Sequence, residues 1–117
     1  MTISNVTIIG AGNGGITAAA DLSDRGFKVT LYENEKFASN LEKINELGGI
    51  YLQEDGKEKF VKVEKVTSDI EEAVKSAEVI MLTIPGFAIE TMAKDLAPVV
   101  DENQVILLNG AGAMGTL

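Results

Sequence analysis

Short apolar runs alternate in this chain with longer segments in which apolar residues recur every three or four positions. Short runs rich in β-branched residues are typical of strands that are buried on both faces of a sheet. Spacing of three and four predicts helices with one apolar face. We therefore expect strands at residues 6–9, 27–32, 63–67, 79–84 and 105–108.

Helices are expected between these strands. The first covers residues 13–25 and closes at Gly26, which can adopt the left-handed conformation of a C-terminal cap. The second covers residues 35–47 and ends at Gly48-Gly49. Its apolar face would contain Phe37, Leu41 and Ile44.

The second half of the chain contains two further helices and a hairpin. Ser68 and Glu71 have the spacing of a capping box, which predicts a helix from Ser68 to about Ser76. The other helix ends before Pro98 and contains Ile89, Met92, Ala93 and Leu96. Apolar runs at residues 50–52 and 60–63 flank Asp55-Gly56, a pair that favours a two-residue hairpin turn.

Strands and helices that alternate in this way predict an α/β fold with a parallel sheet. Parallel neighbours need long crossovers, and these crossovers are right-handed, so helices cover both faces. We expect a Rossmann-type, doubly wound sheet with strand order 3-2-1-4-5 and a small hairpin before the third strand. A ligand crevice would then lie between the first and fourth strands, above residues 10–14 and 84–87.

A glycine-rich turn follows the first strand. Its sequence, Gly10-Ala11-Gly12-Asn13-Gly14-Gly15, matches the dinucleotide fingerprint G-x-G-x-x-G. The three fingerprint glycines would permit a tight turn, close approach of the diphosphate, and close packing of the helix on the strand. Helix amides can bind the diphosphate without basic side chains. An ordinary loop is the alternative interpretation.

Glu33 ends the second strand, about 20 residues after the fingerprint, where an acid that binds the adenine ribose is expected. Its charge would repel a 2′-phosphate and favour NAD, although the neighbouring Lys36 keeps NADP open. A second fingerprint match at residues 110–115 has no following strand or acid. The expected cofactor contacts are Gly10, Ala11, Gly12, Asn13, Gly14, Gly15, Glu33, Ile84, Pro85, Asn109 and Gly110.

Composition narrows the chemistry of this single expected domain, residues 1–117. Cysteine and histidine are absent, so the common zinc ligands and the usual general base are missing, and we expect no metal site and no catalytic residue. The net charge of −8 disfavours nucleic acid, and no apolar run is long enough to span a membrane. The first residues lack a secretory pattern, so we expect a cytoplasmic protein.

Four segments together resemble the N-terminal domain of the opine dehydrogenases, the octopine/nopaline dehydrogenase family. The Gly-Asn-Gly-Gly form of the fingerprint and the Asn-Leu-Glu helix are the more specific of them. Ketopantoate reductases and glycerol-3-phosphate dehydrogenases share the general layout. The segments are residues 10–15, residues 37–50, Thr83-Ile84-Pro85 and Leu108-Asn109-Gly110.

The resemblance implies an enzyme about three times this length that condenses an amino acid with a 2-oxo acid, using NADH or NADPH. In that family the catalytic histidine and most of the substrate pocket belong to a helical C-terminal domain, which has no counterpart in this chain. Many members also carry a histidine where this chain has Ile16. A non-catalytic NAD-sensing domain is the rival interpretation, and the substrates and oligomeric state stay open.

Overall fold

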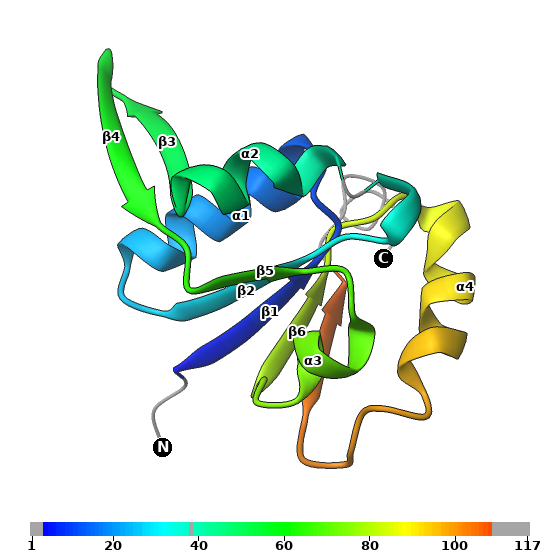
Figure 1. Ribbon diagram of the computed structural model, residues 1–117. Coiled ribbons are helices and arrows are strands. Elements are labelled where there is room, and N and C mark those ends of the chain that lie inside the picture. The colour runs from blue at the N-terminus through cyan, green and yellow to red at the C-terminus, as the bar shows by residue number, and fades with distance from the viewer. Residues whose placement is uncertain (1–3, 38, 109–117) are drawn as a thin grey trace.

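The computed structural model describes residues 4–37 and 39–108. Its main sheet is parallel and has five strands in the order β5-β2-β1-β6-β7, which confirms the predicted order 3-2-1-4-5 (Figure 1). The strands are β1 (Asn5–Ile9), β2 (Lys28–Tyr32), β5 (Lys65–Thr67), β6 (Val79–Leu82) and β7 (Val105–Leu108).

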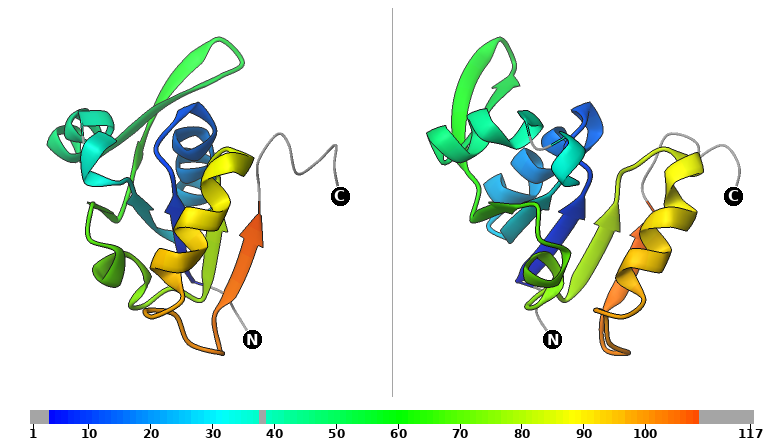
Figure 2. Two further views of the ribbon diagram at one scale, coloured as in Figure 1. Left: turned by 90° about the vertical axis from the view of Figure 1, so that its right-hand side faces the viewer. Right: turned by 45° about the vertical axis from the view of Figure 1, so that its right-hand side comes forward.

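Helices cover both faces of this sheet, as expected for a doubly wound fold (Figure 2). Helices α1 (Asn13–Asp24) and α2 (Ser39–Leu47) lie on one face, and α3 (Ile70–Val74) and α4 (Gly86–Leu96) lie on the other. Gly26 has φ +100°, and its neighbour Phe27 donates to Leu22 O at 3.1 Å, so the predicted left-handed cap of α1 is confirmed.

Alternate residues of each strand supply the two halves of the core. Ile8 and Leu31 point to the α1 face, whereas Ile9 and Ile80 point to the α4 face, and all four are fully buried. Among the described residues, the buried polar side chain is that of Thr7, whose hydroxyl donates to the carbonyl of Ala73 in α3. Strands β1, β2 and β6 are thus largely buried, as their β-branched composition predicts. The expectation is wrong for β7, because this edge strand has only one neighbour in the described sheet and all four of its residues are exposed.

The hairpin is present as predicted. Strands β3 (Gly49–Glu54) and β4 (Lys57–Lys62) pair antiparallel around Asp55 and Gly56, which have φ of +51° and +77°. Two positive φ values at the turn are typical of a type I′ hairpin. Ile50 and Val61 are buried on the inner side, and the hairpin projects beyond α1 and α2 (Figure 1).

The predicted single helix at residues 35–47 is wrong in its first turn. A short 3-10 turn, η1 (Glu35–Phe37), precedes α2, and residue 38 lies outside the described part. The side chain of Asn34 accepts a hydrogen bond from Lys36 N at 2.9 Å, and this local contact holds the chain in a turn. The side chain of Phe37 also lies outside the described part, whereas Leu41 and Ile44 are buried as expected.

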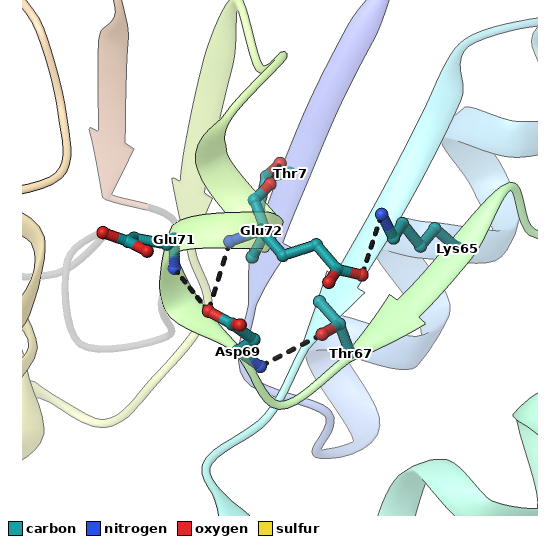
Figure 3. Close-up of polar contacts among 7 residues, drawn as sticks. Thr7, Lys65, Thr67, Asp69, Glu71 and Glu72 are labelled. Atoms are coloured by element: carbon teal, nitrogen blue, oxygen red, sulfur yellow. Dashed lines mark hydrogen bonds and ion pairs between the residues drawn. The ribbon is translucent and has the colours of Figure 1, made fainter.

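The predicted capping box of the third helix is also wrong. Asp69, not Ser68, caps α3: its carboxylate accepts from Glu71 N at 3.0 Å and from Glu72 N at 3.3 Å (Figure 3). Thr67 Oγ1 accepts from Asp69 N at 3.0 Å and so holds Asp69 at the cap. The helix is one residue later at its start and ends at Val74 rather than near residue 76.

Candidate dinucleotide-binding site

The chain reverses direction at Gly10, directly after β1. Gly10 has φ +111°, a conformation that residues with a side chain rarely adopt, and its amide donates to Tyr32 O at 2.8 Å. A Cβ at this position would lie 2.9 Å from Ile84 Cγ2 and 3.0 Å from Thr83 Oγ1. Glycine is therefore required here both by the backbone conformation and by the close approach of β6.

Gly15 brings helix α1 against this bend. A Cβ at Gly15 would lie 1.7 Å from Gly10 O and 2.8 Å from Thr83 Oγ1. Real Cβ atoms essentially never come closer than 3.0 Å to a heavy atom outside their own residue and its two chain neighbours. The last fingerprint glycine thus has the packing role that its position predicts.

Gly12 and Gly14 are open to solvent, in contrast to the two buried glycines. A Cβ at either position would have no heavy atom within 4 Å. The first hydrogen bond of α1 runs from Ile16 N to Gly12 O at 2.9 Å, so the amides of residues 13–15 have no acceptor within the helix. This exposed helix start, with its positive dipole end, suits a diphosphate, and a side chain at Gly12 would obstruct it.

Glu33 lies beside the bend, because β2 neighbours β1 in the sheet. Its Oε2 accepts from Ala11 N at 2.9 Å, and its Oε1 accepts from Asn34 N at 3.0 Å. Each carboxylate oxygen has a second lone pair, so the half-buried group can accept further hydrogen bonds from a sugar diol. The sequence indicated where Glu33 would lie, but its contact with Ala11 was not foreseen.

The start of α4 forms the other wall of this region. Ile84 is half-buried and approaches Gly10, and Pro85 is the N-cap of α4, with its carbonyl accepting from Ala88 N at 2.9 Å. Pro85 thus ends the strand and begins the next helix. Phe87, in the first turn of α4, is 89% exposed. Asn109 and Gly110 lie outside the described residues, as does the second fingerprint match.

Sequence reasoning missed Thr83, the residue that joins the two walls. Its hydroxyl donates to Ile9 O at 3.0 Å and to Gly10 O at 3.1 Å. The sequence offers two signals for it: a place at the end of a buried strand, two residues before Pro85, and membership of the Thr83-Ile84-Pro85 segment that resembles the opine dehydrogenases. Neither signal identifies carbonyls more than 70 positions away as the partners of the hydroxyl.

Tyr32 is a titratable residue next to the bend, because its carbonyl accepts from Gly10 N. Burial raises the pKa of the Tyr32 hydroxyl above its ordinary value of 10.0, and the charges of Asp95 and Glu33 raise it further. The Tyr32 hydroxyl is therefore neutral at physiological pH, and its side chain packs in the half of the core that α3 and α4 cover. Within residues 4–37 and 39–108, no three His, Cys, Asp or Glu side chains are placed to hold a metal ion. No helix of the described part is long and apolar enough to cross a membrane.

Comparison with known proteins identifies the family. The sequence profile described as ketopantoate reductase PanE/ApbA matches residues 6–117. The chain is 32% identical over 110 residues to an opine dehydrogenase of Arthrobacter sp. (strain 1C). The aligned part covers 94% of this chain and 30% of that protein. It is 31% identical over 107 residues to a glycerol-3-phosphate dehydrogenase [NAD(P)+] of Fusobacterium nucleatum, with coverages of 87% and 30%.

The fold is shared with an octopine dehydrogenase whose structure contains NADH and L-arginine. The TM-score is 0.74 at 27% identity, over 90% of this chain and 28% of that one. The resemblance to opine dehydrogenases is therefore confirmed, and the chain spans about 30% of the length of the curated relatives that it matches. The chain belongs to the ketopantoate reductase PanE/ApbA family and has the NAD(P)-binding fold of these oxidoreductases.

Proposed function

We propose that this chain is the NAD(H)-binding domain of a dehydrogenase. The observation that carries the proposal is the pairing of an open helix start at Gly12 with a carboxylate, Glu33, held within hydrogen-bonding distance of the same bend. The amides of Gly12, Asn13 and Gly14 would bind the diphosphate, and Glu33 would bind the adenine ribose. Ile84 and Pro85 would border the cofactor on the β6 side, and Asn109 and Gly110 would lie near the nicotinamide.

Glu33 sets the expected preference for NAD over NADP. A 2′-phosphate on the ribose would bring negative charge beside a carboxylate that is already fixed by two backbone amides. The exposed Lys36 is close enough in sequence to offer a partial counter-charge. We therefore expect NADPH to bind, but more weakly than NADH.

The reaction we propose is that of an opine dehydrogenase. The amine of an amino acid and the carbonyl of a 2-oxo acid would condense to a C=N adduct with loss of water. The nicotinamide would supply a hydride to the carbon and a proton would reach the nitrogen, which turns C=N into a CH-NH bond. The similarity to an opine dehydrogenase and the shared fold of octopine dehydrogenase support this reaction. Glycerol-3-phosphate oxidation is the second candidate, supported by the similarity to the Fusobacterium enzyme, and ketopantoate reduction is the third.

The substrate pocket would belong to a further part of the protein. The relatives are about three times as long as the part they share with this chain. Val105 and Leu107 of β7 lie in register with Val79 and Met81, and they are 52% and 45% exposed. This apolar strip is where we propose that additional structure of the enzyme packs.

Calorimetric titration of the 117-residue chain with NADH and NADPH tests the proposal. We expect saturable binding of NADH, with a Kd at least about tenfold lower than that of NADPH. No saturable binding of either coenzyme up to about 1 mM would refute the assignment.

A separate assay tests the reaction. Oxidation of NADH by the parent protein is followed with pyruvate and a panel of amino acids, and with dihydroxyacetone phosphate or ketopantoate alone. Turnover that needs an amino acid supports the opine reaction, whereas turnover without one refutes it, and a parent protein that binds NADH and oxidises none supports a sensor instead.

A further inference from the structure

One peptide group of the glycine bend is held at both of its polar ends. The group between Gly10 and Ala11 consists of the carbonyl of Gly10 and the amide of Ala11. Thr83 Oγ1 shares its one proton between this carbonyl, at 3.1 Å, and that of Ile9, at 3.0 Å. Glu33 Oε2 accepts from the amide at 2.9 Å. These side chains come from the ends of β6 and β2, the two strands that flank β1.

The part-buried Thr83 hydroxyl lies close to two glycines of the fingerprint. It lies 2.8 Å from the position of a Cβ at Gly15 and 3.0 Å from that of a Cβ at Gly10. Gly10 O itself lies against the Cα of Gly15, since a Cβ there would be only 1.7 Å away. The hydroxyl thus lies in space that a side chain at either glycine would take.

The orientation of this peptide controls the direction of the helix start. Gly10 has φ +111°, and glycine tolerates several conformations at similar energy, so the bend needs contacts to fix one of them. Rotation of the Gly10-Ala11 peptide would move Gly12 and the amides of residues 13 and 14 relative to β1. If the bend were free to rotate, binding of a ligand by these amides would cost free energy to order the loop, and a fixed bend avoids this cost.

We propose that Thr83 is a positioning residue for the coenzyme: with Glu33 it locks the Gly10-Ala11 peptide, so that the amides at the start of α1 are aimed before the diphosphate arrives. The inference rests on the proposed binding of NAD(H) at this site. Thr83 touches the bend and not the diphosphate, and its contribution to affinity comes through the orientation of the backbone. The same lock accounts for the two roles of Glu33, which holds the loop and has lone pairs left for the ribose.

Three substitutions at one position test the lock. Thr83→Val and Thr83→Ala remove the hydroxyl, and Thr83→Ser keeps it. We expect the Kd for NADH to rise about 5- to 10-fold in the first two, the range typical for loss of one hydrogen bond, and to stay within about twofold in the serine variant. Valine places a methyl group where the hydroxyl lay, close to Gly15, and alanine does not. If the valine variant does not fold, the alanine variant still measures the effect of losing the hydroxyl.

Thr7→Val is the matched control. It also removes a hydroxyl that donates to a backbone carbonyl, that of Ala73, on the other side of the molecule from α1. We expect this variant to lower Tm and to leave the Kd for NADH within about twofold of wild type. A Kd that rises as much in Thr7→Val as in Thr83→Val would show that lost stability alone weakens binding, and would overturn the proposal.

Amide hydrogen exchange of Ala11 separates the lock from coenzyme binding. In the coenzyme-free chain we expect Ala11 to exchange faster in Thr83→Val than in wild type, with Thr7→Val unchanged at this amide. Equal protection of Ala11 in wild type and Thr83→Val contradicts the lock, as does an unchanged Kd. If wild type binds no NADH but the exchange result holds, the proposed function has failed while the locked peptide stands.

Discussion

The closest packing in the candidate site is between Gly15 and the carbonyl of Gly10, and Gly15→Ala tests it. The new Cβ would lie 1.7 Å from Gly10 O, so reaching the 3.0 Å minimum seen for real Cβ atoms requires a shift of 1.3 Å, which is 3.0 less 1.7. The obstacle is backbone, so no side-chain rotation can relieve it. Helix α1 must move away from β1 or the bend must change shape.

The cost of this substitution follows from the size of the overlap. Overpacking of a buried site typically costs 1–3 kcal/mol, and we expect about 3 kcal/mol because both neighbours are fixed by the sheet. For a domain of this size that loss lowers Tm by about 12 °C, measured by circular dichroism. Gly14→Ala is the control: its Cβ meets nothing within 4 Å, and alanine favours a helix over glycine, so Tm should stay level or rise. A Gly15→Ala variant that melts within about 2 °C of wild type would refute the packing argument.

Two further substitutions test contacts outside the site. Glu78 accepts from Ser4 N at 2.8 Å and from Asn5 N at 3.0 Å, and these hydrogen bonds lower its pKa below the ordinary 4.5. This stabilisation of the folded state is present above the pKa of the unfolded state and is lost as pH falls through the lower pKa of the folded state. In urea unfolding, Glu78→Gln should therefore have a lower free energy of unfolding than wild type near neutral pH, and the difference should shrink in acid. A difference that does not change with pH contradicts this. Asp69→Ala should lose about 1 kcal/mol by the same method, because the cap of α3 is lost, and Ser68→Ala should lose much less. The reverse order would restore the predicted capping box.

Those parts of the fold that depend on repeated local patterns could be predicted from the sequence. Each β-branched run became a strand, and the strand order followed from the alternation with helices and the rule for parallel crossovers. The turn at Asp55-Gly56 was also predictable, because few residue pairs accept two positive φ values. These features need no knowledge of distant contacts.

Competition between neighbouring polar side chains limited the prediction of helix starts. Ser68 and Asp69 are both good caps, and the choice fell to Asp69 because Thr67 holds its amide. Asn34 ends the extended chain with a side-chain contact to Lys36, which divides the expected second helix into a turn and α2. The sequence contains these alternatives, but small differences in local geometry decide between them.

The candidate site was predictable in outline and not in its supporting contacts. The fingerprint and Glu33 have defined positions relative to strands, so their places followed once the strands were assigned. Thr83 lies in the Thr83-Ile84-Pro85 segment, for which no contact with the bend was predicted. Its hydrogen bond to Gly10 joins residues 73 positions apart, and it exists because β6 happens to end level with the bend.

The central claim is that main-chain amides at Gly12 hold the diphosphate of NADH, and the affinity of Gly12→Val for NADH tests it most directly. Gly12 has φ −80° and ψ −173°, which valine adopts readily, and a Cβ there meets no atom within 4 Å. The variant should therefore fold, while its branched side chain stands in front of the helix start. The account predicts a folded variant without saturable NADH binding up to about 1 mM, and a Kd equal to that of wild type would contradict it.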